Sequence, residues 1–139
     1  MTRILQIILL AAILTSTATA ADYAYTEWMT ASQLTQKLNQ MNENRMFPGT
    51  VEGRVFGEEI RYRAKFIPFL PGMNYFRSRW GMSDDWYTAY TERLTRQGFK
   101  EFSHSVFRDL GGNTVHQATW VLLKSERQPT SAPSQRNRI

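Results

Sequence analysis

The 139-residue chain contains no cysteine. This absence excludes disulfide bonds, zinc–thiolate sites, iron–sulfur clusters and cysteine nucleophiles. Small exported proteins often depend on disulfides, whereas a domain of about 100 residues can be stabilised by its hydrophobic core alone. We therefore expect the pattern of apolar residues to define the fold.

Residues with catalytic potential are few. No serine is followed three positions later by lysine, and the chain has no Gly-x-Ser-x-Gly elbow, no His-Glu-x-x-His motif and no P-loop. The acidic pairs 84–85 and 58–59 are explained by a helix start and a turn, so no pair of carboxylates is left for general acid–base catalysis. We therefore predict that the protein is not an enzyme and uses no cofactor.

Histidine is scarce too, because the chain has only His104 and His116. They fall on the two strands of one predicted hairpin, so they can lie close together, and imidazole is a common metal ligand. A small metal-assisted hydrolase that uses both histidines is the alternative function. His116, however, matches Tyr62 of an earlier strand at an inward-facing position, which favours a structural histidine and no metal site.

One long apolar run occurs, from Ile4 to Leu14, directly after Arg3 and before a small-residue stretch that ends in Ala18-Thr19-Ala20. This order is typical of a secretory signal peptide over residues 1–20, with cleavage after Ala20. The run is shorter than the 20 or so residues that a membrane-spanning helix needs. We expect a secreted or periplasmic protein with no stable membrane insertion after cleavage.

The positive charge lies mostly outside the body of the chain. The net charge is +5, of which Arg3 and the tail at 125–139 account for +3, so residues 21–124 carry only +2. The tail is rich in Ser, Pro, Gln and Arg, and we predict that it is disordered. A body with so little net charge and no recognition motif argues against a nucleic-acid partner.

The body contains two similar halves, Trp28–Pro68 and Trp80–Leu123, at a spacing of about 53 residues. The matches fall at structurally demanding positions: Met29 with Met82, Thr30 with Ser83, Tyr62 with His116, Ala64 with Ala118, and Phe66 with Trp120. We predict one α+β domain over 21–124, built from two tandem repeats at about 22–70 and 71–124.

Each half predicts the order strand–helix–strand–strand. Thr30 and Ser83 are good N-caps, and apolar residues recur after them at helical spacing. Each helix is followed by two strands, joined through 57–58 in the first half and through 109–113 in the second. We expect the helices to pack on antiparallel sheet, with the residues from 74 to 80 forming an edge strand.

The second half resembles a bacterial tandem-repeat module found beside β-lactamase-like serine hydrolases, including polyglycine hydrolases. The first half fits less closely, because Asn44-Arg45-Met46 replaces the Gln-Gly-aromatic helix end and Phe66 replaces a tryptophan. The resemblance implies a non-catalytic accessory module, here in two copies without an enzyme domain. It rests on Ser83, Gln97-Gly98-Phe99, Gly111-Gly112 and Ala118-Thr119-Trp120.

Two surfaces are candidates for binding. One is the cationic face of a strand and the other is an aromatic–basic segment, and arginine beside aromatic rings suits anionic or carbohydrate-bearing partners. The partner would be a cell-envelope component of that kind or another exported protein. The simpler interpretation is a solvated strand face and aromatic residues that join the core. The candidate residues are Arg61, Arg63 and Lys65 on the strand, and Tyr75, Phe76, Arg77, Arg79 and Trp80 in the segment.

Overall fold

Two helices and five strands make up residues 23–125, the part of the chain that this computed structural model describes. The predicted signal peptide, and the tail from residue 126 onward, lie outside the described residues. The elements are α1 (Ala31–Glu43), β1 (Met46–Phe56), β2 (Glu59–Pro68), β3 (Met73–Met82), α2 (Asp84–Arg96), β4 (Lys100–Arg108) and β5 (Thr114–Leu123). Neither helix is long and apolar enough to cross a bilayer.

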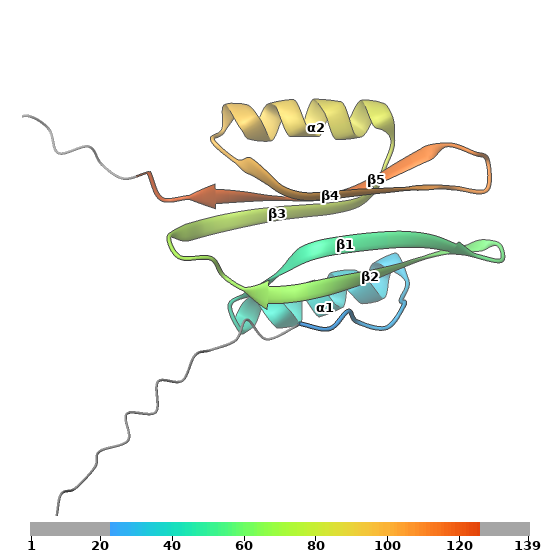
Figure 1. The fold of residues 1–139 in the computed structure, drawn as a ribbon, viewed down its shortest axis with the longest axis horizontal. Coiled ribbons are helices and arrows are strands. Elements are labelled where there is room, and N and C mark those ends of the chain that lie inside the picture. Colours follow the sequence, from blue (N-terminus) through green and yellow to red (C-terminus); the bar gives the residue numbers. More distant parts are fainter. Residues whose placement is uncertain (1–22, 126–139) are drawn as a thin grey trace, which may run out of the picture.

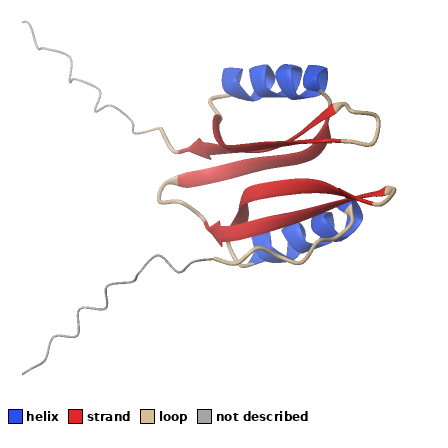
Figure 2. Ribbon diagram, turned by 45° about the vertical axis from the view of Figure 1, so that its right-hand side comes forward, coloured by secondary structure: helices blue, strands red, loops and turns tan. Residues whose placement is uncertain are grey.

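The strands form two antiparallel sheets, one with the order β1-β2 and one with the order β3-β5-β4. The segment before α1 runs beside β2 and makes antiparallel bridges from Tyr25 to Lys65 and from Met29 to Tyr62. Both views place α1 and α2 at opposite ends of the molecule, with all five strands between them (Figures 1 and 2). The predicted α+β class, with helices on antiparallel sheet, is confirmed.

Local sequence signals set the ends of both helices. The Thr30 hydroxyl accepts from the backbone N–H of Gln33, and the Gln33 side chain accepts from the backbone N–H of Thr30, which completes a capping box. Ser83 caps α2 by accepting from the N–H of Trp86. After α2 the chain leaves the helical conformation at Gly98, where φ is 90° and a side chain would be strained. The predicted caps are confirmed.

Each helix packs on the strands of its own half. Leu34 of α1 packs against Val51, Tyr62, Ala64 and Phe66, and α2 builds a second cluster from Met82, Tyr90, Leu94, Phe99, Ala118 and Trp120. Ala64 and Ala118 are almost completely buried, as expected for small residues where a helix crosses closely. Phe66 and Trp120 therefore occupy corresponding places, each in the core of its own half.

The two halves share the order helix–strand–strand, but only the second half begins with a strand, β3. The strand predicted before α1 is not formed within the described residues, because the segment there makes only two isolated bridges to β2. Both helices have 13 residues, and an irregularity interrupts the register between Pro48 and Thr50 in one hairpin and between Glu101 and Ser103 in the other. The hairpin turns differ, since residues 57–58 close the first and residues 109–113 close the second. Descent of the halves from one repeated module stays a prediction.

The halves meet along β1, which lies against β4 and β5. A third apolar cluster of Phe47, Met73 and Val121 fills one end of this contact. Polar bonds also cross it: the Thr119 hydroxyl donates to the carbonyl of Pro48 at 2.8 Å, and the Ser105 hydroxyl donates to the carbonyl of Val51. Apolar burial and directed bonds together hold the two halves against each other.

Candidate functional site

The cationic strand face on β2 is largely engaged by groups of the chain itself. The Arg63 guanidinium lies over the rings of Tyr25 and Trp28, with its central carbon 4.4 and 4.7 Å from the two ring centroids. It also forms a 2.7 Å ion pair with Glu52. An anionic ligand would have to displace this carboxylate to reach Arg63.

The two basic neighbours of Arg63 on β2 also contact side chains of the chain itself. The Arg61 guanidinium makes a 2.6 Å ion pair with Glu59 in the hairpin turn, and the Lys65 ammonium lies 4.9 Å from the Tyr25 ring centroid. The strand alternates as predicted, but its basic side is not freely solvated, because it is covered in part by the segment before α1. The structure brings Arg61, Arg63 and Lys65 onto one face without a free cation cluster.

The aromatic–basic segment lies on β3, at the edge of the three-stranded sheet. Tyr75 is 60% exposed, and Arg77 and Arg79 are exposed. Phe76 and Trp80 turn inward instead: Phe76 packs near Phe47 and Trp80 near Tyr62. The segment therefore divides into an outward set of Tyr75, Arg77 and Arg79 and an inward aromatic set.

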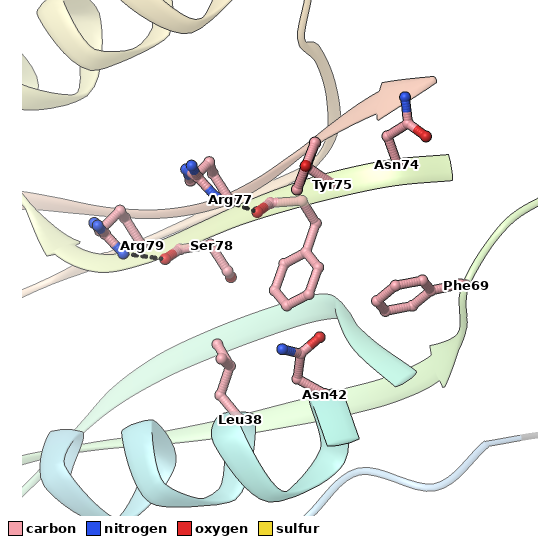
Figure 3. Close-up of a pocket in the computed structure, with 9 residues that line it drawn as sticks. Leu38, Asn42, Phe69, Asn74, Tyr75, Arg77, Ser78 and Arg79 are labelled. Carbon is pink, nitrogen blue, oxygen red and sulfur yellow. Dashed lines mark hydrogen bonds between the residues drawn. The ribbon is translucent and has the colours of Figure 1, made fainter. Parts of the chain in front are cut away.

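A cavity of about 560 Å³ lies between β3 and the C-terminal half of α1, and we call it the β3 groove. Figure 3 shows Leu38 and Asn42 of α1 pointing toward β3 across this space, with Phe69 at one end. Its volume is within the range of small-ligand sites. No Asp or Glu of the described part of the chain lines the groove. The lining residues there are Leu38, Asn42, Phe69, Asn74, Tyr75, Phe76, Arg77, Ser78 and Arg79.

The two arginines of the groove have no carboxylate partner among residues 23–125. Arg77 Nη1 donates to the carbonyl of Phe76 at 3.2 Å, and Arg79 Nη1 donates to the carbonyl of Ser78 at 3.1 Å (Figure 3). The guanidiniums also lie over the rings of Phe99 and Tyr90, at 5.8 and 5.6 Å from the ring centroids. Because a guanidinium has five N–H donors, both retain donors for a ligand. Arg77 and Arg79 are thus charged and accessible at the edge of the sheet.

A second arrangement lies on the α2 side of the sheet, where the two histidines meet. His104 Nε2 and His116 Nδ1 are 2.8 Å apart, and His116 Nε2 is 2.5 Å from Asp84 Oδ1. We call Asp84, His116 and His104 the histidine chain. Because neutral imidazole has one donor and one acceptor, His116 donates to Asp84 and accepts from His104. His116 is buried, which confirms the inward position that the sequence predicts.

Tyr87 of α2 covers the histidine chain. Its ring stacks on both imidazoles, with centroid distances of 4.4 and 4.5 Å and interplanar angles of 4°. Its hydroxyl donates to Glu101. Burial, together with this bond to a carboxylate and the negative charge of Glu101, raises the pKa of Tyr87 to about 12. Burial likewise lowers the pKa of His104, with a further lowering by His116 against an opposing effect of Glu101.

The histidine chain is poorly arranged for a metal ion. Three of its four ring nitrogens are engaged, two with each other and one with Asp84. No group of three or more His, Cys, Asp or Glu side chains within residues 23–125 is placed to hold a metal. A two-histidine metal site would require the bond between the rings to break.

Asp84 and Glu101 were missed as partners of this cluster. Sequence reasoning explained Asp84 by the helix start alone, and the structure adds its bond to His116. A signal was present: the positions in the first half that match His116 and His104 are Tyr62 and Val51. In the second half these positions hold two imidazole rings, and buried imidazole nitrogens need hydrogen-bond partners.

Comparisons of the chain with protein-family models, with curated proteins and with solved structures gave no match. The similarity to the bacterial tandem-repeat module therefore stays a resemblance that rests on the residues named above.

Proposed function

We propose that the chain is an exported, non-catalytic binding module that holds its partner in the β3 groove. Its partner is an anionic or carbohydrate-bearing component of the cell envelope or another exported protein. Export rests on the predicted signal peptide with cleavage after Ala20. The groove supplies a concave surface, and the exposed cations and the exposed ring of Tyr75 stand beside it on the other face of β3 (Figure 3). Together these features suit such partners.

The observation that carries the proposal is that Arg77 and Arg79 have no carboxylate partner among residues 23–125. Both residues line the β3 groove, whose described lining has no carboxylate, and neither forms an ion pair within residues 23–125. Their guanidiniums lie on the α2 side of β3, 5.8 Å from the ring centroid of Phe99 and 5.6 Å from that of Tyr90, and contact no carboxylate there. On β2, by contrast, Arg61 and Arg63 are already paired with Glu59 and Glu52. An anion gains more at the groove because it displaces no carboxylate there.

Catalysis is not part of the proposal because the groove has no nucleophile with a base beside it. Ser78 is the one hydroxyl nucleophile in the lining apart from the phenol of Tyr75. Ser78 is only 3% exposed, and its hydroxyl lies 2.9 Å from that of Thr119. No histidine lines the groove.

The test compares the two candidate surfaces by charge reversal in the mature chain, residues 21–139. Retention on isolated envelope material at low salt is measured for Arg77→Glu/Arg79→Glu and for Arg61→Glu/Lys65→Glu. We expect the first variant to lose retention and the second to keep most of it, and added salt to weaken retention of the wild type. Loss of retention only in the second variant contradicts the proposal, as does equal retention of all three proteins.

A further inference from the structure

β3 is an open sheet edge. Within residues 23–125, β2 is bordered by the segment before α1, and β1 and β4 contact each other across the two halves. Among the described strands, β3 pairs only with β5, and it is ten residues long. Long open edges are the places where another chain can add as a strand, unless charged side chains protect them.

The backbone of β3 presents acceptors on this open side. The carbonyls of Phe76 and Ser78, two residues apart, accept from the arginine side chains rather than from a neighbouring strand. Backbone groups of residues i and i+2 in a strand face the same edge. The two guanidiniums thus cover positions that the N–H groups of an added strand would occupy, and flexible side chains can move away from them.

Charge selects among the strands that could add there. Arg77 and Arg79 are also two residues apart and lie on one face of the strand. An added strand with carboxylates at alternate positions would place an acid opposite each of them, which is a stabilising cross-strand pair. The groove lining offers no carboxylate that would repel such a strand.

The positive charges of Arg77 and Arg79 disfavour binding of segments from this chain itself, either β3 of a second copy or the tail. Antiparallel pairing of β3 with β3 of a second copy would bring arginines close to arginines, which destabilises a sheet. The tail at 126–139 carries three arginines against one glutamate, so it too has the wrong sign. The favoured occupant is a different polypeptide.

We infer that the partner in the β3 groove is an extended, acidic polypeptide segment that pairs with β3 as a fourth strand of the three-stranded sheet. This inference rests on the proposed function and specifies its ligand. Main-chain hydrogen bonds to the open side of β3 provide affinity, and pairing of alternate carboxylates with Arg77 and Arg79 provides selectivity.

The test uses fluorescein-labelled ten-residue peptides and the mature chain. The first peptide alternates Glu and Val, and the second alternates Lys and Val. The third repeats the first with N-methyl groups on the Val nitrogens, whose N–H groups face the carbonyls of Phe76 and Ser78 when Glu lies opposite the arginines. We expect the Glu peptide to bind and the Lys peptide to bind at least tenfold more weakly. We expect N-methylation to weaken binding by at least tenfold, because the third peptide has lost donors but no charge. Backbone resonances of β3 should shift with the Glu peptide.

Matched variants locate the site. Arg77→Glu/Arg79→Glu should lose the Glu peptide and gain the Lys peptide. The control Arg54→Glu/Arg108→Glu makes the same change of net charge outside the groove lining and should behave as the wild type. Circular dichroism shows whether each variant is folded.

The outcomes separate the inference from the proposed function. Equal binding of the Glu peptide and its N-methylated form overturns strand pairing but leaves the groove as an anion site. A second outcome also overturns the inference alone: no peptide binds the wild type, while Arg77→Glu/Arg79→Glu still loses its retention on envelope material. Dimerisation of the mature chain through β3 overturns the choice of occupant. Envelope retention that is indifferent to Arg77 and Arg79 overturns the proposed function itself.

Discussion

His104 Nε2 lies 2.8 Å from His116 Nδ1, so the imidazole of His104 donates a hydrogen bond to that of His116. When both rings are cationic neither nitrogen has a lone pair to accept with, and the bond is lost. The groups that face the pair are Asp84 and Tyr87 from α2 and Glu101 from β4. This relationship gives the protein a pH-dependent contact inside its second half.

The first prediction follows from the sign of the His104 shift. Burial lowers the pKa of His104 in the folded state below the ordinary value of 6.5. The unfolded chain therefore binds more protons near and just below pH 6.5, so His104 makes stability fall as the pH decreases. We expect urea midpoints to decrease from pH 7.5 to 5.5, and to decrease less in His104→Gln, whose amide can still donate to His116. An equal decrease in both proteins contradicts this assignment.

The second prediction concerns the core of the second half. Trp120 is fully buried against Ala118 and Tyr90. Trp120→Ala should therefore lower the free energy of unfolding by about 3–5 kcal/mol, through lost burial and a residual cavity. Trp86→Ala is the control, because Trp86 is 47% exposed, and it should cost less than about 1 kcal/mol. Urea unfolding measures both, and similar losses for the two variants would be inconsistent with this packing.

A third prediction tests the close approach of the halves. A Cβ atom at Gly53 would lie 2.3 Å from the Phe107 ring. Gly53→Ala should destabilise the domain by about 1–3 kcal/mol through overpacking. The loss should be smaller in the background of Phe107→Leu, since the shorter side chain leaves room and the two effects are then not additive. Strictly additive losses in a double-mutant cycle show that the ring does not cause the effect.

The fourth prediction concerns metal ions. Three of the four ring nitrogens of the histidine chain are engaged, two with each other and one with Asp84. Ligands that bind the folded state raise its melting temperature. We expect neither excess zinc nor a chelator to shift the Tm of the mature chain, as followed by circular dichroism. A clear rise with zinc that disappears in His104→Gln would instead favour the metal-assisted hydrolase.

The fifth prediction concerns processing. If residues 1–20 are a signal peptide, the exported protein begins at Ala21. Mass spectrometry of the protein recovered from the periplasm or the medium should give the mass of residues 21–139. Ala20→Arg, which removes the small residue before the cut, should leave the uncleaved form with the cells. A full-length protein outside the cytoplasm would contradict the predicted site.

The features that were predicted from the sequence depend on neighbouring residues. The capping box at Thr30, the turn at 57–58 and the strand alternation around Tyr62 each involve contacts a few residues apart, and all three are present. Short-range preferences of this kind are set by backbone geometry and by the spacing of apolar residues. They were sufficient for the fold class and for most element boundaries.

The candidate sites depend instead on contacts between distant residues. Asp84 and His116 are 32 positions apart, and Glu52 is 11 positions from Arg63 across a hairpin. The β3 groove arises only when α1 is placed opposite a strand of the other half. Sequence periodicity assigns each of these residues to an element, but it does not say which elements become neighbours. For that reason the basic residues were found and their partners were not.

β5 connects all these features, because every residue from Val115 to Val121 is buried. Its even-numbered side chains complete the cluster under α2, while Thr119 and Val121 belong to the contact with the first half. This strand is also the last element within residues 23–125. During synthesis or translocation, neither the second half nor the seam between the halves can close until the C-terminal strand has emerged. Truncation even a few residues before Leu123 should therefore leave a chain that proteases degrade, rather than a smaller stable fragment.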